Sequence, residues 1–378
     1  MQKKKILIIS ITNQDSDPRI IRQVNFLKDE YDIFCCGLNN SYISEEKFIK
    51  VNSRNNTGFS KIIIGTLKLF RLYDSAESFV VNTKLKFEVN DKLTQFDIII
   101  ANDFDTLALA LKKFNAKKVI ADFHEYAPSE FEDKLYWKYI HKNFVIHQCI
   151  KYFPYIAAIT TVCKSIADEY EREFGRRPVV ITNAAAYVDL KPSPVKEKIR
   201  MIHHGAAISS RKIEITIEVA KLLDDRFTLD LMLIPNEKEY LDKLKIMSAG
   251  SKNIKFIEPV SFEEIVKFCN SYDVGIFILP PVNLNYKYAL PNKFFEFIQS
   301  RLAILTGPSK EMSEYIDRYE LGLHTKTFKP LEIAEEIKNL SNEQIMHFKK
   351  NSDRYAKDLS AEENKKILNN TVKDILAD

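Results

Sequence analysis

Short apolar runs alternate with polar turns and amphipathic stretches along this chain. In its first half these runs are continuous rather than alternating, which is typical of parallel strands buried on both faces of a sheet. The strands predicted there are Ile6 to Ile11, Tyr31 to Cys36, Phe96 to Ala101, Lys118 to Phe123 and Ile156 to Val162. Because helical patterns separate the runs, the first half is predicted to be a doubly wound α/β domain.

The pattern weakens after Asn183, and residues 191–198 have the proline and charge content of a linker. The same alternation then restarts. The strands predicted in the second half are Ile199 to His203, Thr228 to Ile234, Ile254 to Ile257, Val274 to Leu279 and Ala303 to Leu305. We therefore predict two Rossmann-like doubly wound domains, residues 1–190 and 199–341, facing a central cleft. Residues 342–378 have a charged helical pattern with no strand after it and are expected to pack back on the N-terminal domain.

Length and composition narrow the class of protein. A chain of 378 residues exceeds what one hydrophobic core normally serves. Its net charge of +4, from 56 basic and 52 acidic residues, is too balanced for a dedicated nucleic-acid binder, so no nucleic-acid partner is expected. The 5 cysteines include no C-x-x-C pair, which argues against a disulfide framework and a zinc site and fits a reducing cytoplasm. No apolar run approaches the ~20 residues of a membrane-spanning helix, and the first is too short for a signal peptide.

The most informative segment is residues 289–297, Ala-Leu-Pro-Asn-Lys-Phe-Phe-Glu-Phe, which follows a predicted strand. Pro291 suits the first turn of a helix, and the helix is predicted to run to about Ser300. Its N-terminal N–H groups and dipole suit a diphosphate, to which Lys293 adds a cation. Glu296, expected in the first turn, can accept hydrogen bonds from two ribose hydroxyls. The alternative is an i, i+3 surface pair between Lys293 and Glu296 on an ordinary helix.

A second basic segment opens the C-terminal domain. Residues 203–212 read His-His-Gly-Ala-Ala-Ile-Ser-Ser-Arg-Lys: a strand end, a glycine, and a basic pair at the following helix. Arg211 can grip a diphosphate with two parallel hydrogen bonds, and the alternative is a surface cap of that helix. Both segments follow strands of one predicted sheet, at the edge where open α/β sheets bind ligands. The chain has only 9 glycines and lacks the glycine-rich dinucleotide and P-loop patterns.

Six segments in this order resemble the GT-B-fold glycosyltransferases of the family 4 type, and the resemblance covers nearly the whole chain. The segments are Asp17-Pro18-Arg19, residues 121–125 (Ala-Asp-Phe-His-Glu), residues 160–167 (Thr-Thr-Val-Cys-Lys-Ser-Ile-Ala), residues 181–183 (Ile-Thr-Asn), residues 205–212 and residues 290–297. The resemblance implies that Arg211 contacts the donor diphosphate, that Glu296 binds the ribose and that His124 approaches the donor sugar. It also implies retention of the anomeric configuration.

Two positions depart from the family's pattern. Ala206 stands directly after the glycine, where the family often has an arginine, and Tyr288 stands eight residues before Glu296, where it often has a second glutamate. A tyrosine can hydrogen-bond to the sugar or pack on it, but it is not a carboxylate. The departures therefore bear on the orientation and identity of the donor sugar. The predicted donor-binding residues are Gly205, Arg211, Lys212, Tyr288, Asn292, Lys293 and Glu296.

The candidates of the first domain follow its strands. His124, after the strand ending at Phe123, is expected to face the cleft, and the alternative is a structural histidine with satisfied hydrogen bonds. Asp122 and Glu125 also suggest the two carboxylates of a glycosidase. We discount this interpretation, because a hydrolase needs no diphosphate-binding site. The predicted catalytic residues, on the acceptor side, are His124, Asp103, Asp17 and Arg19.

Two D-x-D patterns raise the question of a metal ion. Asp103-Phe104-Asp105 ends a strand, and Asp15-Ser16-Asp17 lies in a loop. A D-x-D after a strand is also the Mn²⁺ or Mg²⁺ site of the other large glycosyltransferase fold. We favour helix capping by Asp103 or Asp105, with acceptor contact, because the second half already supplies a diphosphate site without metal. No metal and no cofactor beyond a nucleotide-sugar substrate are therefore expected.

The stretch from Lys134 to Ala167 combines basic and aromatic residues without an acidic one. Lys134, Lys138 and Lys142 recur every four residues on a predicted helix. Such a helix can rest on an anionic membrane surface or meet a lipid-linked acceptor, and residues 134–155 are the expected contact. The alternative places the aromatic rings in the core and the lysines in water.

These patterns together predict a cytoplasmic, metal-independent glycosyltransferase at the inner face of the membrane. It is expected to move a sugar from a nucleoside-diphosphate sugar onto a glycan or lipid-linked acceptor in bacterial surface polysaccharide assembly. Two alternatives stay open: a sugar-nucleotide epimerase of the same fold, and a noncatalytic partner of another transferase. An epimerase would interconvert free nucleotide sugars, whereas the noncatalytic partner would show neither nucleotide affinity nor turnover.

Overall fold

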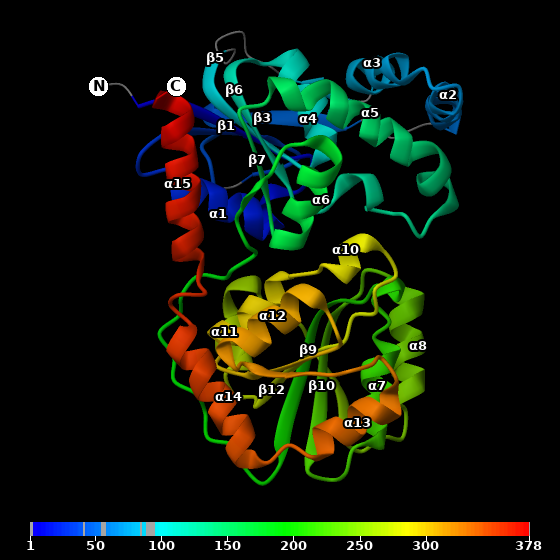
Figure 1. The fold of residues 1–378 in the computed structure, drawn as a ribbon, viewed down its shortest axis with the longest axis vertical. Coiled ribbons are helices and arrows are strands. Elements are labelled where there is room, and N and C mark those ends of the chain that lie inside the picture. Colours follow the sequence, from blue (N-terminus) through cyan, green and yellow to red (C-terminus); the bar gives the residue numbers. More distant parts are fainter. Residues whose placement is uncertain (1–2, 41, 54–57, 84, 88–94, 378) are drawn as a thin grey trace. The chain divides into compact units, whose positions relative to one another are not determined.

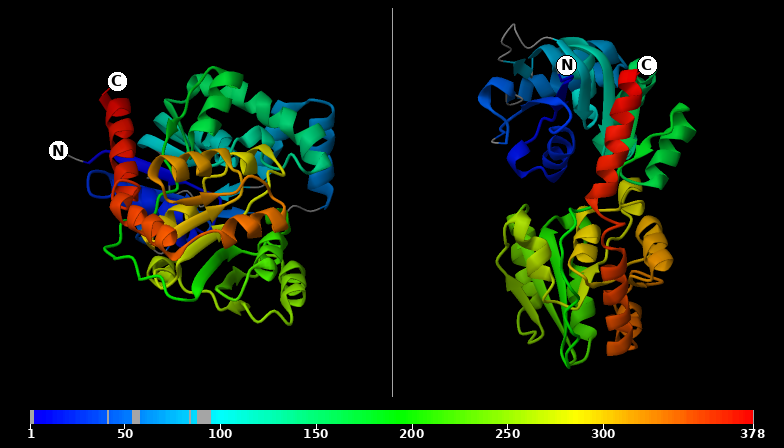
Figure 2. Two further views of the ribbon diagram at one scale, coloured as in Figure 1. Left: turned by 60° about the horizontal axis from the view of Figure 1, so that its bottom comes forward. Right: turned by 90° about the vertical axis from the view of Figure 1, so that its left-hand side faces the viewer.

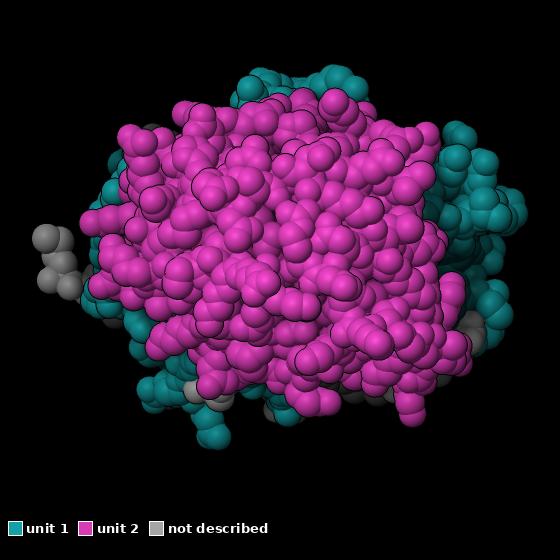
Figure 3. Space-filling model, turned by 90° about the horizontal axis from the view of Figure 1, so that it is seen from below, with its two compact units in different colours: residues 1–182, 283–285, 364–378 teal, residues 183–282, 286–363 magenta. Residues whose placement is uncertain are grey.

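The computed structural model describes residues 3–40, 42–53, 58–83, 85–87 and 95–377 (Figure 1). The chain divides into two compact units, drawn in different colours in Figure 3. Unit 1 comprises residues 1–182, 283–285 and 364–378, and unit 2 comprises residues 183–282 and 286–363. Each unit has its own sheet and its own core.

Unit 1 is an α/β unit whose described residues form an eight-stranded sheet in the order β4-β3-β2-β1-β5-β6-β7-β8. The strands are β1 Lys5–Ile9, β2 Asp32–Gly37, β3 Phe48–Ser53, β4 Leu85–Phe87, β5 Gln95–Asn102, β6 Asn115–Phe123, β7 Ala158–Thr161 and β8 Val179–Val180. The helices are α1 Pro18–Leu27, α2 Gly58–Leu69, α3 Tyr73–Thr83, α4 Phe104–Lys113, α5 Lys142–Tyr152, α6 Lys164–Phe174 and the C-terminal α15 Ala361–Ala377. The pairs are parallel except that of β3 with β4.

The core of unit 1 explains the continuous apolar pattern of its strands. All residues of β1 from Ile6 to Ile9 are buried, because the strand lies inside a sheet covered on both faces. Ile6 and Ile8 pack with apolar residues of α1 and of α15. Asn369 Nδ2 of α15 also donates to the backbone oxygen of Phe26. The C-terminal helix thus completes this core, and Figure 2 shows it beside unit 1 in both views.

Unit 2 contains a six-stranded sheet, among the described residues, in the order β11-β10-β9-β12-β13-β14. The strands are β9 Ile199–Ala206, β10 Phe227–Ile234, β11 Ile254–Ile257, β12 Val274–Phe277, β13 Ala303–Thr306 and β14 Gly322–His324. The helices are α7 Glu214–Leu222, α8 Lys238–Ser248, α9 Ile265–Cys269, α11 Asn292–Gln299, α12 Lys310–Tyr319, α13 Pro330–Lys338 and α14 Asn342–Tyr355. The short helix α10 Leu284–Lys287 has its first two residues in unit 1 and its last two in unit 2. The pairs are parallel, and this 3-2-1-4-5-6 order is that of nucleotide-binding Rossmann folds.

Helices cover both faces of the unit 2 sheet. Met201 of β9 belongs to a core that includes Ile217 of α7 and Ile333 of α13. Because side chains alternate along a strand, His204 points to the opposite face, where the ring of Phe297 from α11 stands edge-on at 5.2 Å. The order of the strands reverses between β9 and β12. The carboxyl ends of these two strands are therefore the expected ligand edge of the unit.

The predicted fold class, two Rossmann-like α/β domains, is confirmed, and every expected strand is present with slightly shifted ends. The pattern missed β3, β4, β8 and β14. Of these, β8 and β14 are two and three residues long, half-buried, and outermost in their sheets. Such short strands lack the long apolar run that marks a strand buried on both faces.

Candidate functional site

The predicted donor residues of unit 2 centre on Gly205, at the carboxyl end of β9. Its backbone φ of +124° is one that glycine adopts at little cost and other residues rarely adopt. A Cβ on this residue would stand 3.0 Å from Lys293 Nζ and 3.8 Å from Arg211 Nη1. The absence of a side chain thus allows two cationic groups to converge on the backbone at the ligand edge of the sheet.

Lys293 is the most unusual group of this half of the site. It is buried in the first turn of α11, and in the described part of the chain its Nζ has no hydrogen-bond partner. The amine lies 4.2 Å from the centre of the Phe277 ring. Burial, reinforced by the Arg211 guanidinium and opposed by the Glu296 carboxylate, holds the pKa of Lys293 well below its usual range. A buried amine without a partner is costly, and a bound anion would remove that cost.

Glu296 lies further along α11 and is also buried. Its Oε2 lies 3.5 Å from His204 Nε2. Burial, with the nearby Lys293, lowers the pKa of His204 to about 3, so its imidazole is neutral at pH 7. A carboxylate has four lone-pair sites, and a neutral imidazole can donate to at most one of them. Glu296 can therefore accept hydrogen bonds from a ligand as well.

The helix carrying these residues differs in two details from the prediction. It begins at Asn292, with Pro291 at the N-cap, so that Glu296 lies in the second turn rather than the first. The alternative of a surface pair is wrong, because the side chains of Lys293 and Glu296 are only 7% and 5% exposed. Both side chains are instead part of the interior at the ligand edge.

The basic pair at residues 211 and 212 is split by the local backbone. Arg211 ends a short 3-10 turn, Ser209–Arg211, ahead of α7, so the alternative in which it caps that helix is wrong. It donates to the backbone oxygen of Ala206 at 3.2 Å. Lys212 has a φ of +54° and an exposed side chain, whose Nζ lies 4.0 Å from Glu214 Oε1. Of the pair, therefore, Arg211 approaches Gly205 whereas Lys212 is turned toward solvent.

The two predicted sugar-lining residues lie at the N-terminal end of α11 and just before it. Tyr288 is half-buried, and the centre of its ring lies 5.2 Å from Lys287 Nζ and 5.7 Å from Lys310 Nζ. Asn292 is the first residue of α11 and is also half-buried. A tyrosine between two lysines cannot supply the negative charge of the family's second glutamate. The surroundings of Tyr288 are basic instead.

In unit 1, His124 and Asp103 line a cavity of about 250 Å³. His124 Nδ1 lies 3.5 Å from Asp103 Oδ1. The remaining lining residues are Phe104, Phe123, Glu125, Ala127 and Glu130. Burial, together with the neighbouring Glu125 carboxylate, raises the pKa of Glu130 to about 8. The cavity therefore combines a protonated carboxylic acid, carboxylates and an imidazole, which can exchange hydrogen bonds with hydroxyl groups.

Asp103 has an unusual backbone at the end of β5. It occupies the N-cap position of α4 with φ +63° and ψ 157°, and its side chain makes no capping hydrogen bond. The favoured capping role is therefore wrong for Asp103. A non-glycine residue in this region costs about 1–3 kcal/mol, and such strain clusters at functional sites. The strained backbone of Asp103 places its carboxylate beside His124 rather than at the N-terminus of α4.

A buried ion pair supports the other ring nitrogen of His124. Arg19 Nε lies 3.0 Å from Asp122 Oδ2, which is itself 3.8 Å from His124 Nε2. Gln23 and Thr160 donate to the same carboxylate at 2.6 and 2.5 Å. Burial alone would raise the pKa of Asp122, but the Arg19 guanidinium, His124 and the Thr160 hydroxyl lower it to about 2. Arg19 therefore contacts His124 only indirectly, by way of Asp122. It does not line the cavity.

Asp17 is placed at the start of α1. It accepts hydrogen bonds from the backbone N–H groups of Arg19 and Ile20, and from Thr12 Oγ1 at 3.0 Å. This is an N-cap, which stabilises the helix by about 1 kcal/mol. Of the four predicted catalytic residues, the structure brings His124 and Asp103 together in the cavity, whereas Asp17 and Arg19 lie outside its lining.

Solved structures of similar fold cover nearly the whole chain. The HepE protein of Anabaena, crystallised with UDP and glucose, matches with a TM-score of 0.69 at 12% identity, over 98% of this chain and 100% of that one. A glycosyltransferase from Rickettsia africae matches with a TM-score of 0.67 at 11% identity, over 100% and 99%. WaaG, a glycosyltransferase involved in lipopolysaccharide biosynthesis, gives 0.60 at 12% identity, over 96% and 99%. The chain has the GT-B fold. No protein-family model matches the sequence, and no curated protein does.

Three residues that lie at the candidate sites of this GT-B protein were not among the predicted site residues. His204 and Asp122 are polar residues within apolar strands, and that interruption was the available signal. Buried polar groups need partners, and here the partners are Glu296 and Arg19. Glu130 follows a 3-10 turn outside the helices and strands, and nothing in its sequence context indicates that it lines a cavity.

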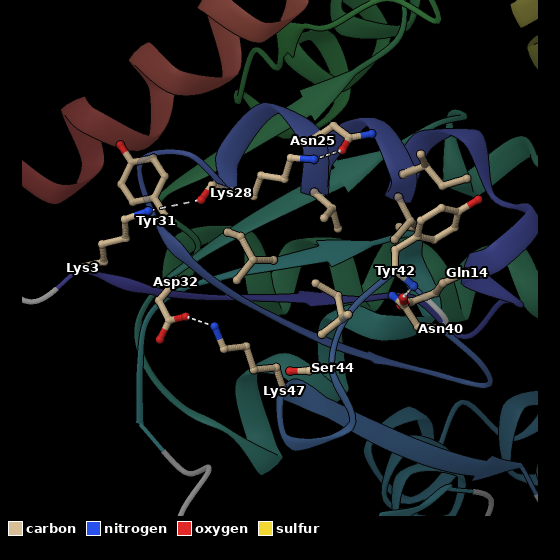
Figure 4. A pocket seen from close by; sticks show the side chains of 15 residues that line it. Lys3, Gln14, Asn25, Lys28, Tyr31, Asp32, Asn40, Tyr42, Ser44 and Lys47 are labelled. Carbon is tan, nitrogen blue, oxygen red and sulfur yellow. Dashed lines mark hydrogen bonds and ion pairs between the residues drawn. The ribbon is translucent and has the colours of Figure 1, made fainter. Parts of the chain in front are cut away.

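Another pocket lies along α1 in unit 1 of the GT-B fold (Figure 4). It has a volume of about 410 Å³ and contains none of the predicted site residues. Figure 4 shows its charged groups engaged locally: Lys47 Nζ lies 2.6 Å from Asp32 Oδ1, and Lys28 Nζ donates to Asn25 Oδ1 at 2.8 Å. Among the residues described, no group of three or more His, Cys, Asp or Glu side chains is placed to hold a metal ion.

Proposed function

We propose that this GT-B protein is a glycosyltransferase that uses a nucleoside-diphosphate sugar. One observation carries the proposal: the buried Lys293 amine, with no hydrogen-bond partner among the described residues, meets Arg211 at Gly205. Two cationic groups at the carboxyl end of β9 suit a diphosphate. HepE was crystallised with UDP-glucose, which makes this nucleotide sugar the first donor to test.

The remaining unit 2 residues complete the proposed donor site. Glu296 accepts hydrogen bonds from the ribose hydroxyls, because its carboxylate is buried close to the amine that holds the diphosphate. Tyr288 and Asn292 contact the sugar. Lys212, which is exposed, adds positive charge at the edge of the site. The basic surroundings of Tyr288 favour a donor sugar whose hydroxyl groups accept hydrogen bonds from lysines.

The proposed reaction is a displacement at the anomeric carbon. The bond from this carbon to the diphosphate oxygen breaks, the acceptor hydroxyl oxygen bonds to the same carbon, and the proton of that hydroxyl passes to an oxygen of the leaving diphosphate. Arg211 and Lys293 neutralise the charge that develops on the leaving diphosphate, so no metal ion is needed. His124 and Asp103, with their cavity, bind the acceptor, which is a glycan or a lipid-linked sugar. Retention of configuration, surface polysaccharide assembly and a cytoplasmic location at the inner face of the membrane belong to the same proposal.

Ligand binding tests the donor site directly. Thermal-shift measurements with UDP, GDP, CDP, ADP and TDP should identify one or more that stabilise the protein, by about 2.7 kcal/mol at 100 times the dissociation constant. Arg211→Met and Glu296→Gln should each weaken binding of that nucleotide at least tenfold, or about 1.4 kcal/mol. Arg226→Met is the matched control, since Arg226 precedes β10 at the opposite edge of the same sheet. Unchanged affinity in both site variants would remove the proposed donor site.

Turnover distinguishes the proposal from its alternatives. Release of UDP from UDP-glucose that depends on an added glycan acceptor supports transfer. Interconversion of the free nucleotide sugar would identify an epimerase, and binding without either reaction would identify a noncatalytic protein. Rates that persist in EDTA support metal independence, whereas loss of activity that Mn²⁺ restores would contradict it.

A further inference from the structure

Helix α2 of unit 1 turns an apolar face outward. Phe59, Ile62 and Leu69, with Phe70 directly after the helix, are between 62% and 73% exposed. At 100° per residue these four positions lie within an arc roughly 100° wide, which is the width of a face that a helix usually buries. Exposed large apolar side chains are common singly, but a whole helix face of them indicates a binding surface.

The opposite side of α2 is the one attached to the rest of unit 1. Ile64 and Lys68 are buried. Lys68 Nζ lies 2.6 Å from His141 Nδ1 and 4.1 Å from the centre of the Phe144 ring, at the start of α5. Figure 1 shows α2 and α3 as a pair of helices next to α5 at the edge of this unit. The attachment therefore fixes which face of α2 meets solvent.

The segment that precedes α5 adds to the same surface. Residues Trp137–His141 form a turn of π-helix that runs into α5 and contacts α2. Leu135, Tyr136 and Tyr139 are 50% to 74% exposed, whereas Phe144, Tyr152 and Phe153 are buried. The aromatic residues of the stretch 134–155 are thus divided between the core and the surface. Leu135, Tyr136 and Tyr139 lie in or directly before the π-helical turn that contacts α2, a helix that the sequence pattern did not single out, whereas the exposed Tyr155 lies beyond α5.

The two segments that supply these side chains carry charge of one sign. Residues 58–72 and 134–155 contain Lys and Arg but no Asp or Glu. Lys142 and Lys151 are paired with Glu132 and Asp74. The side chains left exposed are Lys61, Arg71, Lys134 and Lys138. An anionic surface complements them, whereas a second copy of this chain would bring the same positive charges together.

We propose that these residues dock the protein on an anionic lipid bilayer. The basic apolar face consists of Phe59, Ile62, Leu69, Phe70, Leu135, Tyr136 and Tyr139 with Lys61, Arg71, Lys134 and Lys138. Its apolar side chains enter the headgroup region while the lysines and Arg71 meet lipid phosphates, as in helices that lie on a membrane. No helix in the part of the chain described here is long and apolar enough to cross a bilayer, so the contact is peripheral. Docking of this kind would hold the enzyme next to a lipid-linked acceptor.

Vesicle sedimentation tests the docking without nucleotide, so its outcome is independent of the proposed transfer reaction. The full chain should sediment at low salt with vesicles containing about one-third phosphatidylglycerol, but not with pure phosphatidylcholine. Salt of about 0.5 M should release most of it. Lys134→Glu with Lys138→Glu, and separately Phe59→Ser with Phe70→Ser, should each lower partitioning at least about tenfold.

Matched changes on α8 of unit 2 provide the control. Ile246→Ser alters a side chain that is 76% exposed, and Lys243→Glu with Lys245→Glu reverses two exposed charges. These variants should sediment like the wild-type chain. The single tryptophan, Trp137, reports on the contact site: brominated lipids should quench its fluorescence if the face meets the bilayer.

Three outcomes would overturn the docking proposal. The first is a wild-type chain that stays in solution with anionic vesicles at low salt. The second is an equal loss of binding in the α8 controls. The third is a dimer, measured by light scattering, that Phe59→Ser with Phe70→Ser dissociates while no vesicle binding is seen, which would assign the face to a second copy of this chain.

Discussion

Lys293 Nζ lies 3.0 Å from the point where a Cβ on Gly205 would stand. The two residues come from different elements, β9 and α11, and meet at the edge of the sheet where the strand order reverses. A glycine at this position adopts the backbone φ of +124° at little cost, and its lack of a side chain leaves room for the Lys293 amine. This closeness means that a change of residue 205 acts on the diphosphate site as well as on the fold.

Gly205→Ala should weaken nucleoside-diphosphate binding at least tenfold. The new methyl group would displace the Lys293 amine, and the strained backbone should cost about 1 kcal/mol of stability. Gly250→Ala is the matched control, because Gly250 has a φ of +81° but no atom within 4 Å of the added Cβ. Both variants should lose stability in thermal melts, but only Gly205→Ala should lose at least tenfold in affinity by calorimetry. An equal loss of affinity in both would place the effect in the fold rather than at the site.

Lys293→Met should stabilise the free protein while it weakens nucleotide binding. The folded protein holds the pKa of this amine well below its unfolded value, so protonation favours the unfolded chain and folding is opposed. Removal of the amine removes that opposition. A gain of 1 kcal/mol would appear as a melting temperature about 2–4 °C higher. The exposed control is Lys310→Met. A lower melting temperature for Lys293→Met would contradict the conclusion that the buried amine lacks a hydrogen-bond partner among the described residues.

Binding of a nucleoside diphosphate should take up a proton when the pH lies above the pKa of Lys293 in the free protein. Burial first, and Arg211 second, lower the pKa of Lys293 in the free protein, and a diphosphate would raise it again. Glu296, His203 and His204 also face this amine, and His204, with a pKa of about 3, stays neutral. The affinity for the nucleoside diphosphate should therefore increase as the pH falls toward the pKa of Lys293 in the free protein. Calorimetry in two buffers of different ionisation enthalpy measures the uptake, which should vanish in Lys293→Met.

The sequence predicted the parts of the molecule that are encoded by continuous apolar runs. β1, β9 and β12 are buried on both faces, and their positions at the strand reversals place Gly205 and Asp103 at the ligand edges. The convergence of Lys293 and Arg211 was also predictable, since each follows a strand of the same sheet. For these features local pattern and global fold agree.

The features that the sequence did not predict depend on distant contacts. His204 faces Glu296 because α11 packs on that side of β9, and the charge of Asp122 is stabilised above all by Arg19, which reaches it from α1. The outward face of α2 is a third example, because its apolar pattern equally suits a buried helix. Which face is covered is decided by Lys68 and its contacts at α5.

Asp122→Asn should strongly destabilise unit 1. The change leaves the Arg19 guanidinium buried without its carboxylate, and loss of one partner of a buried pair costs about 3–5 kcal/mol. Urea denaturation at pH 7 measures this loss, with the exposed Asp133→Asn as the control. The double variant Asp122→Asn with Arg19→Met should lose less unfolding free energy than the sum of the two single variants, because Arg19→Met removes the guanidinium that Asp122→Asn leaves unpaired.

The same pair should set part of the acid sensitivity of the fold. The pKa of Asp122 is lowered to about 2, below its unfolded value of about 3.9, so its contribution is complete above the unfolded value. The contribution is lost as the pH falls from about 5 toward 2. The wild-type chain should therefore lose stability over this range more steeply than Asp122→Asn, whereas Asp133→Asn should follow the wild-type curve. Parallel curves for the wild type and Asp122→Asn would show that the carboxylate is not held by Arg19 in solution.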